Sequence, residues 1–337
     1  FTSSDIEDAG IQRPEDFIAL TPNVVMANTV NVGDTLVTIR GLTSTRDAES
    51  NFAFVVDGVL QTNPNAFNRE LLDIAQIEVL KGPQGALYGR NATSGAILIT
   101  TKAPSEESES TAVVGMGVNN STKLQFVNSG KMGENVYTRF SVSTRDTDGE
   151  HTNVFSNSNN VDHFEDTTIR TRFLVDNGDS SWDLRAGISE ASGGTINFNA
   201  VFALPAFQGF GTPGADQFYK DVNSHQFTYM FNVPPVNEQE TADISLKYTE
   251  DMGDGREFSA ILAYNHLEEF LLSDGTSGAF GGYFGVPSCA ASNTASNLAL
   301  INSLPPGFSF AAPGTAPSAA NSVLGPYLPH TCVGYQF

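Results

Sequence analysis

The sequence predicts an antiparallel membrane β-barrel preceded by a small α+β domain. Three observations predict this fold. Seven segments after residue 110 alternate apolar and polar residues with a period of two, and the connections between them are alternately short and long. The first 104 residues instead mix helical and strand-like patterns. Period-two alternation is typical of strands with one apolar face, and short turns on one side with long loops on the other are the layout of outer-membrane barrels.

The change in composition predicts two domains and a connection. Residues 1–104 are expected to form the α+β domain, and residues 111–337 the N-terminal part of the barrel with long extracellular loops. Between them the acidic and serine-rich segment 105–110, SEESES, is expected to be a solvated hinge.

The elements of the first domain follow from local signals. The segment 14–24 is predicted to contain a short helix, because Pro14 suits a first turn, acidic residues follow it, and Pro22 lies just past its end. Strands are predicted over 36–42 and 52–61, the second turning at Asp57-Gly58. A helical turn is predicted over 70–74, followed by strands over 77–80 and 96–101.

A glycine-rich segment, KGPQGALYGRNATSG (81–95), separates the last two of these strands. Its glycines do not have the spacing of a phosphate-binding P-loop or of a dinucleotide-binding turn. The segment is therefore predicted to be a tight connection between strands, in which glycines supply positive φ angles.

The strands of the predicted barrel have two distinct faces. The apolar face is expected to meet lipid, and the polar face, which carries recurrent arginines, to line the lumen. A soluble β-sandwich would also alternate, but loops of about 20–50 residues are uncommon in compact soluble domains. The residues predicted to face lipid are Val136, Phe140, Ile169, Phe173, Trp182, Leu184, Ile244, Leu246, Phe258 and Leu262, and those predicted to face the lumen and meet carboxylates are Arg139, Arg170, Arg172 and Arg185.

Composition argues against several other functions. The formal net charge is −21, which disfavours nucleic-acid binding because phosphate contacts need clusters of Lys and Arg. The five histidines and two cysteines show no metal-ligand spacing, and no catalytic constellation stands at a recognisable spacing. We therefore expect no metal, no cofactor and no enzymatic activity.

Several motifs in order resemble one family. VTIRGL (37–42), VVDGV (55–59) and DIAQIEVLKGPQGALYGRNATSGAILITTKAP (73–104) resemble plug-domain motifs of the TonB-dependent outer-membrane receptors, and residues 1–24 look like the opening of such a plug. The resemblance implies a plug in the lumen of a barrel of about 22 strands. Seven strands cannot close such a barrel, so we expect the sequence to be a fragment of a longer chain. We also expect this fragment to begin after the family's energy-coupling box.

The resemblance also implies a function. Such receptors are located in the outer membrane of Gram-negative bacteria, in contact with its lipid. They take up a scarce extracellular ligand with energy delivered by TonB and its inner-membrane complex. A ferric siderophore is the expected ligand; cobalamin, a carbohydrate or another solute is the alternative, and a passive porin is a further one.

Candidate site residues follow from the same resemblance. Arg40, Lys81 and Arg90 are expected to contact the barrel, although lysine cannot make the bidentate pair that arginine makes. The outward loops of the plug, 43–51 and 61–69, are expected to contact ligand, with Phe67 as an exposed aromatic. The predicted ligand contacts are Arg46, Asn51, Gln61, Asn65, Phe67 and Asn68.

The two cysteines are predicted to pair. Cys289 and Cys332 both follow the seventh strand, in a segment expected to be extracellular. Because an outer-membrane protein matures in an oxidising compartment, we expect a Cys289–Cys332 disulfide.

Overall fold

The computed structural model describes residues 1–28, 35–45, 48–153, 157, 161–194 and 235–272. The chain divides into two compact units. The first unit comprises residues 1–148, 164–193 and 237–271 and contains the elements analysed below. In the second unit, which includes residues 149–163, the Asp162 carboxylate accepts hydrogen bonds from the backbone N–H groups of Glu150 and His151, each at 2.9 Å. Among the described residues, no helix is long and apolar enough to cross a membrane.

Two short helices open the N-terminal domain. Helix α1 (Ser3–Asp8) begins after Thr2 and has a capping box. The Thr2 hydroxyl accepts from the Asp5 backbone N–H, and the Asp5 carboxylate accepts from the Thr2 backbone N–H. Helix α2 (Pro14–Ala19) begins at Pro14, and the Asp16 carboxylate accepts from the backbone N–H groups just before it. The short helix predicted within 14–24 is therefore confirmed: it begins at Pro14 and ends at Ala19, before Pro22.

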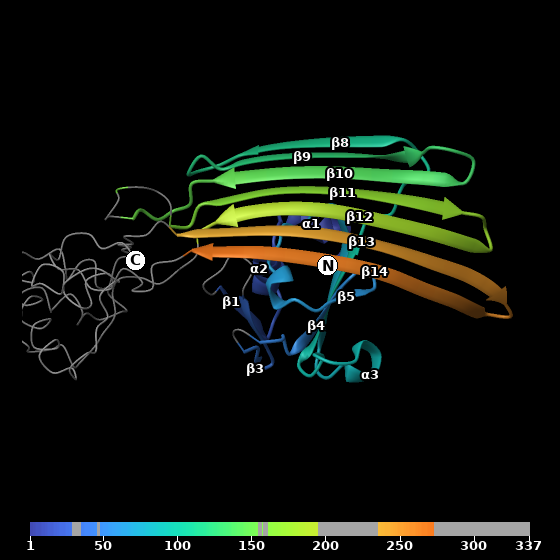
Figure 1. The fold of residues 1–337 in the computed structure, drawn as a ribbon, viewed down its shortest axis with the longest axis horizontal. Coiled ribbons are helices and arrows are strands. Elements are labelled where there is room, and N and C mark those ends of the chain that lie inside the picture. Colours follow the sequence, from blue (N-terminus) through green and yellow to red (C-terminus); the bar gives the residue numbers. More distant parts are fainter. Residues whose placement is uncertain (29–34, 46–47, 154–156, 158–160, 195–234, 273–337) are drawn as a thin grey trace, which may run out of the picture. The chain divides into compact units, whose positions relative to one another are not determined.

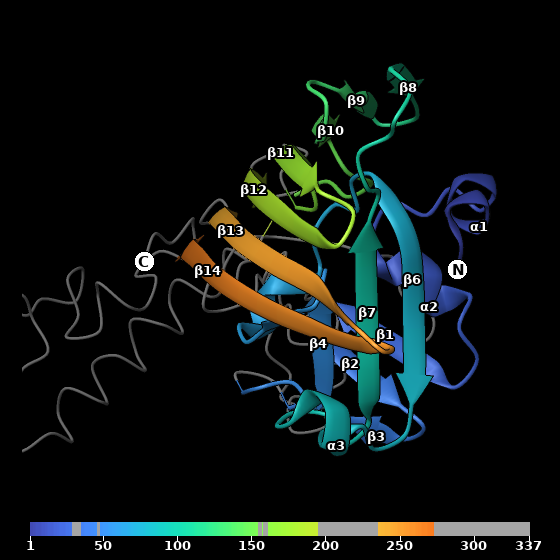
Figure 2. The same cartoon turned by 90° about the vertical axis from the view of Figure 1, so that its right-hand side faces the viewer.

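The N-terminal domain contains two small sheets. One has the order β1–β2–β3, with β1 (Val24–Asn28), β2 (Thr35–Ile39) and β3 (Leu42–Thr43) antiparallel. The other has the order β5–β4–β7–β6, with β4 (Phe52–Val56), β5 (Val59–Gln61), β6 (Ile74–Lys81) and β7 (Gly95–Thr101), and Figure 2 shows β7 and β6 side by side. Strands β4 and β7 are parallel, and the other pairs are antiparallel.

Residues with positive φ confirm one predicted turn of this domain and interrupt one predicted strand. The β4–β5 hairpin turns at Asp57 and Gly58, with φ of 51° and 85°, as predicted. The strand predicted over 36–42 is interrupted after Ile39, because Arg40 and Gly41 both have positive φ.

The prediction for 70–74 is wrong: these residues form no helix, and β6 already begins at Ile74. The physical reason is Asp73, whose φ of 58° cannot continue a right-handed helix. A short 3₁₀ helix, η1 (Pro64–Ala66), stands a few residues earlier in the chain.

The glycine-rich segment contains a helix that the sequence did not predict. Helix α3 (Gly85–Tyr88) is a single turn between β6 and β7. Gly82 and Gly89 have the predicted positive φ, at 111° and 73°, whereas Gly85 is helical.

The larger apolar core cluster of the N-terminal domain contains several aromatic residues. Phe17, Ile39 and Ile77 are fully buried, and the cluster also contains Phe52, Phe54 and Phe67. Phe67 makes edge-to-face contacts with Phe52 and Phe54 at ring distances of 5.1 and 5.0 Å. These contacts join η1 to the central sheet, so the segment after β5 is fixed to the core.

An exposed ion pair at helix α1 gives a pH prediction. The Lys102 ammonium donates to the Glu7 carboxylate at 3.0 Å, and this hydrogen bond lowers the Glu7 pKa below its usual 4.5. A lowered pKa stabilises the fold above about pH 4.5, and the contribution is lost as the pH falls through the folded-state value.

Because Glu7 is largely exposed, we expect Glu7→Gln to reduce the stability of α1 by less than about 1 kcal/mol at pH 7 and by nothing near pH 3. Hydrogen–deuterium exchange of the α1 amides at both pH values measures this difference. Asp8→Asn, on the same helix, is the control. An equal loss of protection at the two pH values would contradict the role of the ion pair.

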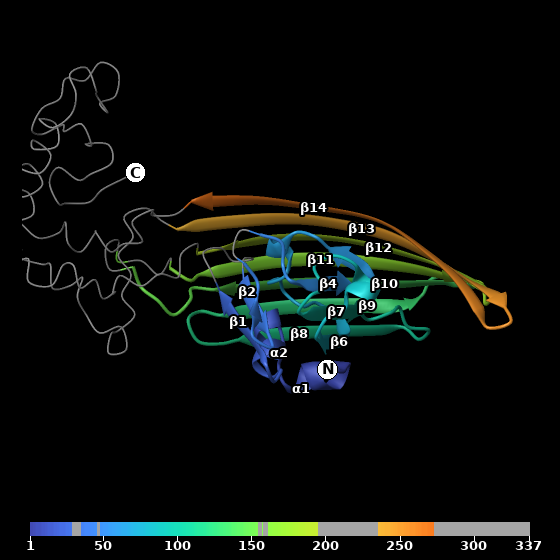
Figure 3. The ribbon, with the colours of Figure 1, turned by 90° about the horizontal axis from the view of Figure 1, so that it is seen from below.

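The second half of the described chain forms one antiparallel sheet, here called the wall sheet. Its strands lie side by side in the order β14 to β8 (Figures 1 and 3). Strand β8 begins within the predicted hinge. The strands are β8 (Glu109–Met116), β9 (Thr122–Lys131), β10 (Val136–Thr147), β11 (Phe164–Asp176), β12 (Ser180–Gly193), β13 (Val236–Gly253) and β14 (Arg256–Leu272).

The predicted seven strands and their faces are confirmed. Phe140, Thr171, Ala186 and Ile244 stand opposite one another across four strands, on the face away from the N-terminal domain. Of the ten residues predicted to face lipid, seven are exposed large hydrophobics and the other three are partly exposed. Trp182 and Tyr248 pack together on this face at a ring distance of 4.5 Å, near the short turns, where aromatic residues favour the membrane–water interface.

Candidate functional site: the interface of the N-terminal domain and the wall sheet

The other face of the wall sheet carries rows of charged residues. Arg139, Arg172, Arg185 and Ser245 stand directly opposite one another on β10 to β13. We call the first three the arginine row. Like charges directly opposite on a sheet repel each other, so such a row needs nearby carboxylates.

Arg139 joins the wall sheet to the N-terminal domain. Its guanidinium makes two hydrogen bonds to the Asp73 carboxylate, one of them at 2.7 Å, and a further bond to Glu109 at 2.6 Å. Ser141, two residues along β10, donates to the same Asp73 carboxylate at 2.8 Å. Both ends of the ion pair are buried, with 7% and 8% of the side chains exposed. The Asp73 carboxylate is thereby joined to two residues of β10.

The other two arginines of the row share one wall carboxylate. Asp183 accepts two bonds from Arg172, at 2.9 and 2.8 Å, and one from Arg185 at 2.6 Å. Arg172 also donates to the backbone carbonyls of Thr101 and Lys102, at the end of β7.

Arg185 reaches the turn of the β4–β5 hairpin. It donates to the Asp57 carbonyl at 3.0 Å and pairs with the Asp57 carboxylate at 3.4 Å. That carboxylate also accepts from the backbone N–H and the hydroxyl of Thr101. One aspartate therefore joins the hairpin, strand β7 and the wall.

A third acid of the N-terminal domain is almost completely buried. Only 1% of the Glu70 side chain is exposed, and it pairs with Lys123 at 2.8 Å and Arg145 at 3.5 Å, which stand opposite each other on β9 and β10. The N-terminal domain thus brings Asp57, Glu70 and Asp73 to wall cations.

In one further ion pair the cation belongs to the N-terminal domain and the acid to the wall sheet. Arg69 pairs with Asp243 of β13 at 3.5 Å. Burial lowers the pKa of Arg69, and the charge of Asp243 opposes this shift. The interface is therefore held by ion pairs of both polarities.

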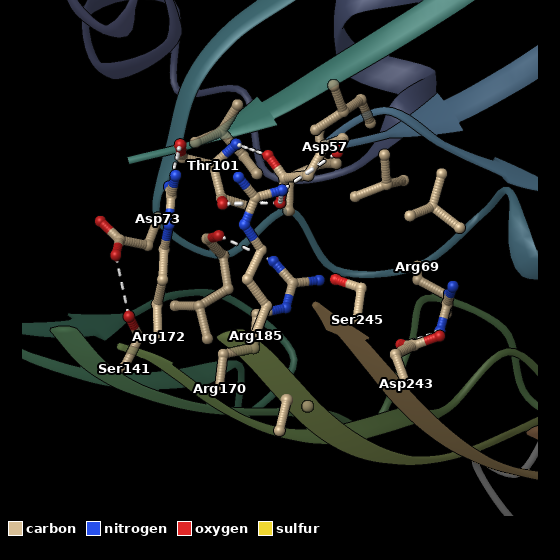
Figure 4. Close-up of a pocket in the computed structure, with 18 of the residues that line it drawn as sticks. Asp57, Arg69, Asp73, Thr101, Ser141, Arg170, Arg172, Arg185, Asp243 and Ser245 are labelled. Carbon is tan, nitrogen blue, oxygen red and sulfur yellow. Dashed lines mark hydrogen bonds and ion pairs between the residues drawn. The ribbon is translucent and has the colours of Figure 1, made fainter. Parts of the chain in front are cut away.

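A cavity of about 110 Å³ lies within this interface. In Figure 4, Asp73 lies beside Arg172 and Ser141, and Arg185 points toward Asp57. Arg170 comes from the row next to the arginine row, opposite Ser141 on one strand and Gly187 on the other. Its guanidinium donates to the Leu72 carbonyl at 2.9 Å.

The predicted orientation of the four wall arginines is confirmed. Arg139, Arg172 and Arg185 meet carboxylates, as predicted. Arg170 faces the same way, but its guanidinium donates to the backbone carbonyl of Leu72. The acids Asp57, Glu70 and Asp73 were not predicted as site residues. The signal that marks two of them is an aspartate within an apolar run, in VVDGV and LLDIA.

The predicted plug–barrel cations make contacts inside the N-terminal domain. Lys81 donates to the Pro22 carbonyl at 2.6 Å, and Arg90 pairs with Glu49 at 3.2 Å. The Arg40 backbone N–H donates to Asn23. Their contact with a barrel stays a prediction.

The predicted ligand contacts fall into different environments. The expectation that Phe67 is exposed is wrong: only 3% of it is accessible, because it fills the aromatic core. Asn68 is buried to the same degree. The Asn51 side chain accepts from Ser44 and Ser94.

Gln61 and Asn65 are partly exposed at the edge of the interface, where Asn65 donates to Glu269 of β14 at 2.7 Å. Their ligand role stays a prediction. Arg46, Cys289 and Cys332 lie outside the described residues, and with them the predicted disulfide.

The comparisons with known proteins agree with this architecture. Residues 1–96 match the model of the TonB-dependent Receptor Plug Domain. Over 185 residues the chain is 24% identical to the pesticin receptor of Yersinia pestis. This aligned stretch covers 54% of this chain and 27% of that receptor. Over 174 residues it is 25% identical to the vitamin B12 transporter BtuB of Vibrio vulnificus, covering 50% of this chain and 28% of the transporter.

Solved structures show the same fold. The ferric yersiniabactin uptake receptor FyuA from Yersinia pestis aligns with a TM-score of 0.68 at 19% identity, over 81% of this chain and 41% of that one. The ferric-catecholate import receptor Fiu from Escherichia coli K12 aligns with a TM-score of 0.65 at 18% identity, over 81% and 39%. The matched stretch covers about a quarter of the length of these two curated relatives.

A plug-type domain bound through ion pairs to an antiparallel wall with an apolar outer face defines a plugged outer-membrane barrel. Residues 1–96 belong to the TonB-dependent receptor plug-domain family, and the wall sheet that follows has the fold of such receptors. From here on, the N-terminal domain is called the plug.

Proposed function

We propose that the chain is part of a receptor that takes up a scarce extracellular ligand across the outer membrane, with a ferric siderophore as the ligand. The observation that carries the proposal is the ionic interface between plug and wall sheet. Separating an apolar core costs about 25 cal/mol of free energy for each Å² of apolar surface exposed to water. Separating ion pairs exposes groups that water hydrates, so a plug held in this way can move within a wetted lumen.

The energy for that movement is proposed to come from TonB. In this proposal TonB transmits work from the proton gradient of the inner membrane and pulls on the plug after ligand binds outside. The names of several relatives support the substrate class, since FyuA is described as a ferric yersiniabactin uptake receptor and Fiu as a ferric-catecholate import receptor. The relative BtuB is a vitamin B12 transporter, which keeps cobalamin as the specific alternative.

The domain limits belong to the same proposal. We place the plug at 1–104 and its hinge to the wall at 105–110. Strand β7 ends at Thr101 and β8 begins at Glu109, which supports a connection within this interval. The Ser105 backbone N–H and hydroxyl both contact the Ser129 hydroxyl of β9, at 2.8 and 2.9 Å, so the connection has an attachment to the wall.

Growth under iron limitation tests the function. The full-length protein is produced in a Gram-negative strain that lacks its own siderophore receptors, and growth is measured with ferric catecholate, hydroxamate and phenolate siderophores. We expect at least one siderophore to restore growth, and a matched strain without TonB to remain starved.

Other outcomes separate the alternatives. Uptake of cobalamin alone would assign the vitamin, whereas growth that does not need TonB, with a steady large conductance in bilayers, would indicate a porin. Hydrolysis of a panel of esters, peptides and glycosides by the purified protein would indicate an enzyme. Each of these results would contradict the proposed function.

A further inference from the structure

We propose that Phe164 is a positioning residue of the wall sheet, which anchors the start of helix α2 by holding the Arg13 guanidinium of the plug over its ring. The anchor is a cation–π contact and not an ion pair. It concerns how the plug is seated and not which ligand is taken up, so the inference goes beyond the proposed function.

The first support is the position of the ring. Phe164 is the first residue of β11, at the end of the wall sheet where the connection 148–163 joins β10 to β11. Residues two apart on a strand point to the same side, so Phe164 shares the inward face with Asp166, Thr168 and Arg170. Only 7% of Phe164 is exposed. A buried aromatic ring therefore stands among polar and charged side chains.

The second support is the pair of cations at this ring. The Cζ atom of Arg13 lies over the Phe164 ring, 4.5 Å from its centroid, and the Cζ atom of Arg145, on β10, lies over the same ring at 5.7 Å. A cation within about 6 Å of the centroid is attracted by the negative face of the ring. Guanidinium is planar and weakly hydrated, so it stacks well on such a face. The plug and the wall thus each contribute one arginine to this ring.

The third support is the set of other groups that hold Arg13. Its guanidinium pairs with Glu15 at 3.5 Å and donates to the Asn68 carbonyl at 3.4 Å, and both partners belong to the plug. Its Nε is buried and has no hydrogen-bond partner among the described residues. Within the described part of the chain, the Phe164 ring is therefore the contact that joins Arg13 to the wall.

The anchor acts at a corner of the plug where two segments meet. The Leu71 backbone N–H donates to the Gln12 carbonyl at 2.7 Å, which joins the segment before α2 to the segment before β6. The neighbouring Glu70 pairs with Arg145 at 3.5 Å. Because Glu70 keeps its ionic partners without the ring, we expect a weaker ring contact to loosen the start of α2 in particular.

Hydrogen–deuterium exchange of the full-length protein in detergent tests the inference. Phe164 is replaced site-specifically by phenylalanine that carries one, two or three ring fluorines. Fluorine withdraws electron density from the ring face and so weakens the attraction for a cation, whereas the ring keeps nearly the same size and becomes more apolar. We expect the protection of the α2 amides to fall with each added fluorine, by about five- to tenfold over the series.

The same series at Phe140 is the matched control. This ring lies on the outer face of the wall sheet, and no cation lies over it in the part of the chain that the structure describes. We expect the control series to leave the α2 amides unchanged.

A second background isolates the plug arginine. Arg13→Met removes the cation and keeps an unbranched side chain, so fluorination of Phe164 is then expected to change the α2 protection by less than about twofold. Protection that stays constant or rises with fluorination in the wild-type background would show that only apolar burial of the ring matters, and would overturn the inference. An equal stepwise loss in the Arg13→Met background would overturn it as well. The measurement needs neither ligand nor TonB, so its outcome is independent of the proposed function.

Discussion

Replacing Arg139 with methionine is expected to loosen the plug more than any other single change in the wall sheet. Methionine keeps much of the length of the side chain but removes the charge that Asp73 and Glu109 share. Asp73 would then be a buried carboxylate with Ser141 as its remaining donor from the wall. Removing one partner of a buried ion pair costs about 3–5 kcal/mol, because the other charge is left uncompensated.

The stability of the seated plug measures this effect. The full-length protein in detergent is exposed to increasing urea, and trypsin reports when the plug becomes accessible. We expect Arg139→Met to lower the urea midpoint strongly, and Arg256→Met, in an exposed pair, to leave it unchanged.

A second variant separates the loss of the pair from the burial of a lone charge. Adding Asp73→Asn to Arg139→Met removes the orphaned carboxylate, so the double variant is expected to recover part of the loss. A midpoint equal to that of the wild type in Arg139→Met would show that the ion pair does not hold the plug. A double variant weaker than the single one would contradict the proposed cause.

Replacing Gly95 with alanine is expected to disrupt the central sheet of the plug. Gly95 begins β7 opposite Lys81, and an added Cβ would lie 2.2 Å from the Leu80 carbonyl oxygen and 3.3 Å from the Ile39 side chain. The obstructing atom belongs to the backbone of β6 and cannot rotate away. Strands β6 and β7 would have to separate locally, and such overpacking costs about 1–3 kcal/mol or more.

Gly85→Ala provides the matched control in the same glycine-rich segment. Gly85 is helical, and its added Cβ would meet no atom within 4 Å. Alanine there is expected to be neutral or stabilising by up to about 1 kcal/mol. Urea midpoints of the plug, measured by trypsin as above, compare the two variants. Equal midpoints for Gly95→Ala and Gly85→Ala would show that the sheet tolerates the added atom.

The glycine-rich segment shows which structural features local sequence patterns predict and which they do not. The sequence predicts positive φ for the glycines of this tight connection; Gly82 and Gly89 have it, whereas Gly85 and Gly95 do not. Gly95 is required for a different reason, because the carbonyl of a neighbouring strand lies against it. No spacing rule contains that information, since it depends on which strands pair.

The ligand residues show the same limit. Phe67 is flanked by polar residues in a turn-rich segment, which is typical of an exposed loop. Its ring is buried because Phe52 and Phe54 of β4 leave room for it in the core. A single aromatic in a polar segment is compatible with either environment, and only the packing of the domain decides between them.

The sequence by itself determined the strands of the wall sheet and their two faces, because successive side chains of a strand point to opposite sides. It also determined the family, through the order of the motifs in the first 104 residues, and it placed the four wall arginines on the inward face. Only the tertiary structure decided their partners. Asp57, Glu70 and Asp73 are distant in sequence from the wall, and which acid meets which cation depends on the seating of one domain against the other, which a period of two does not encode.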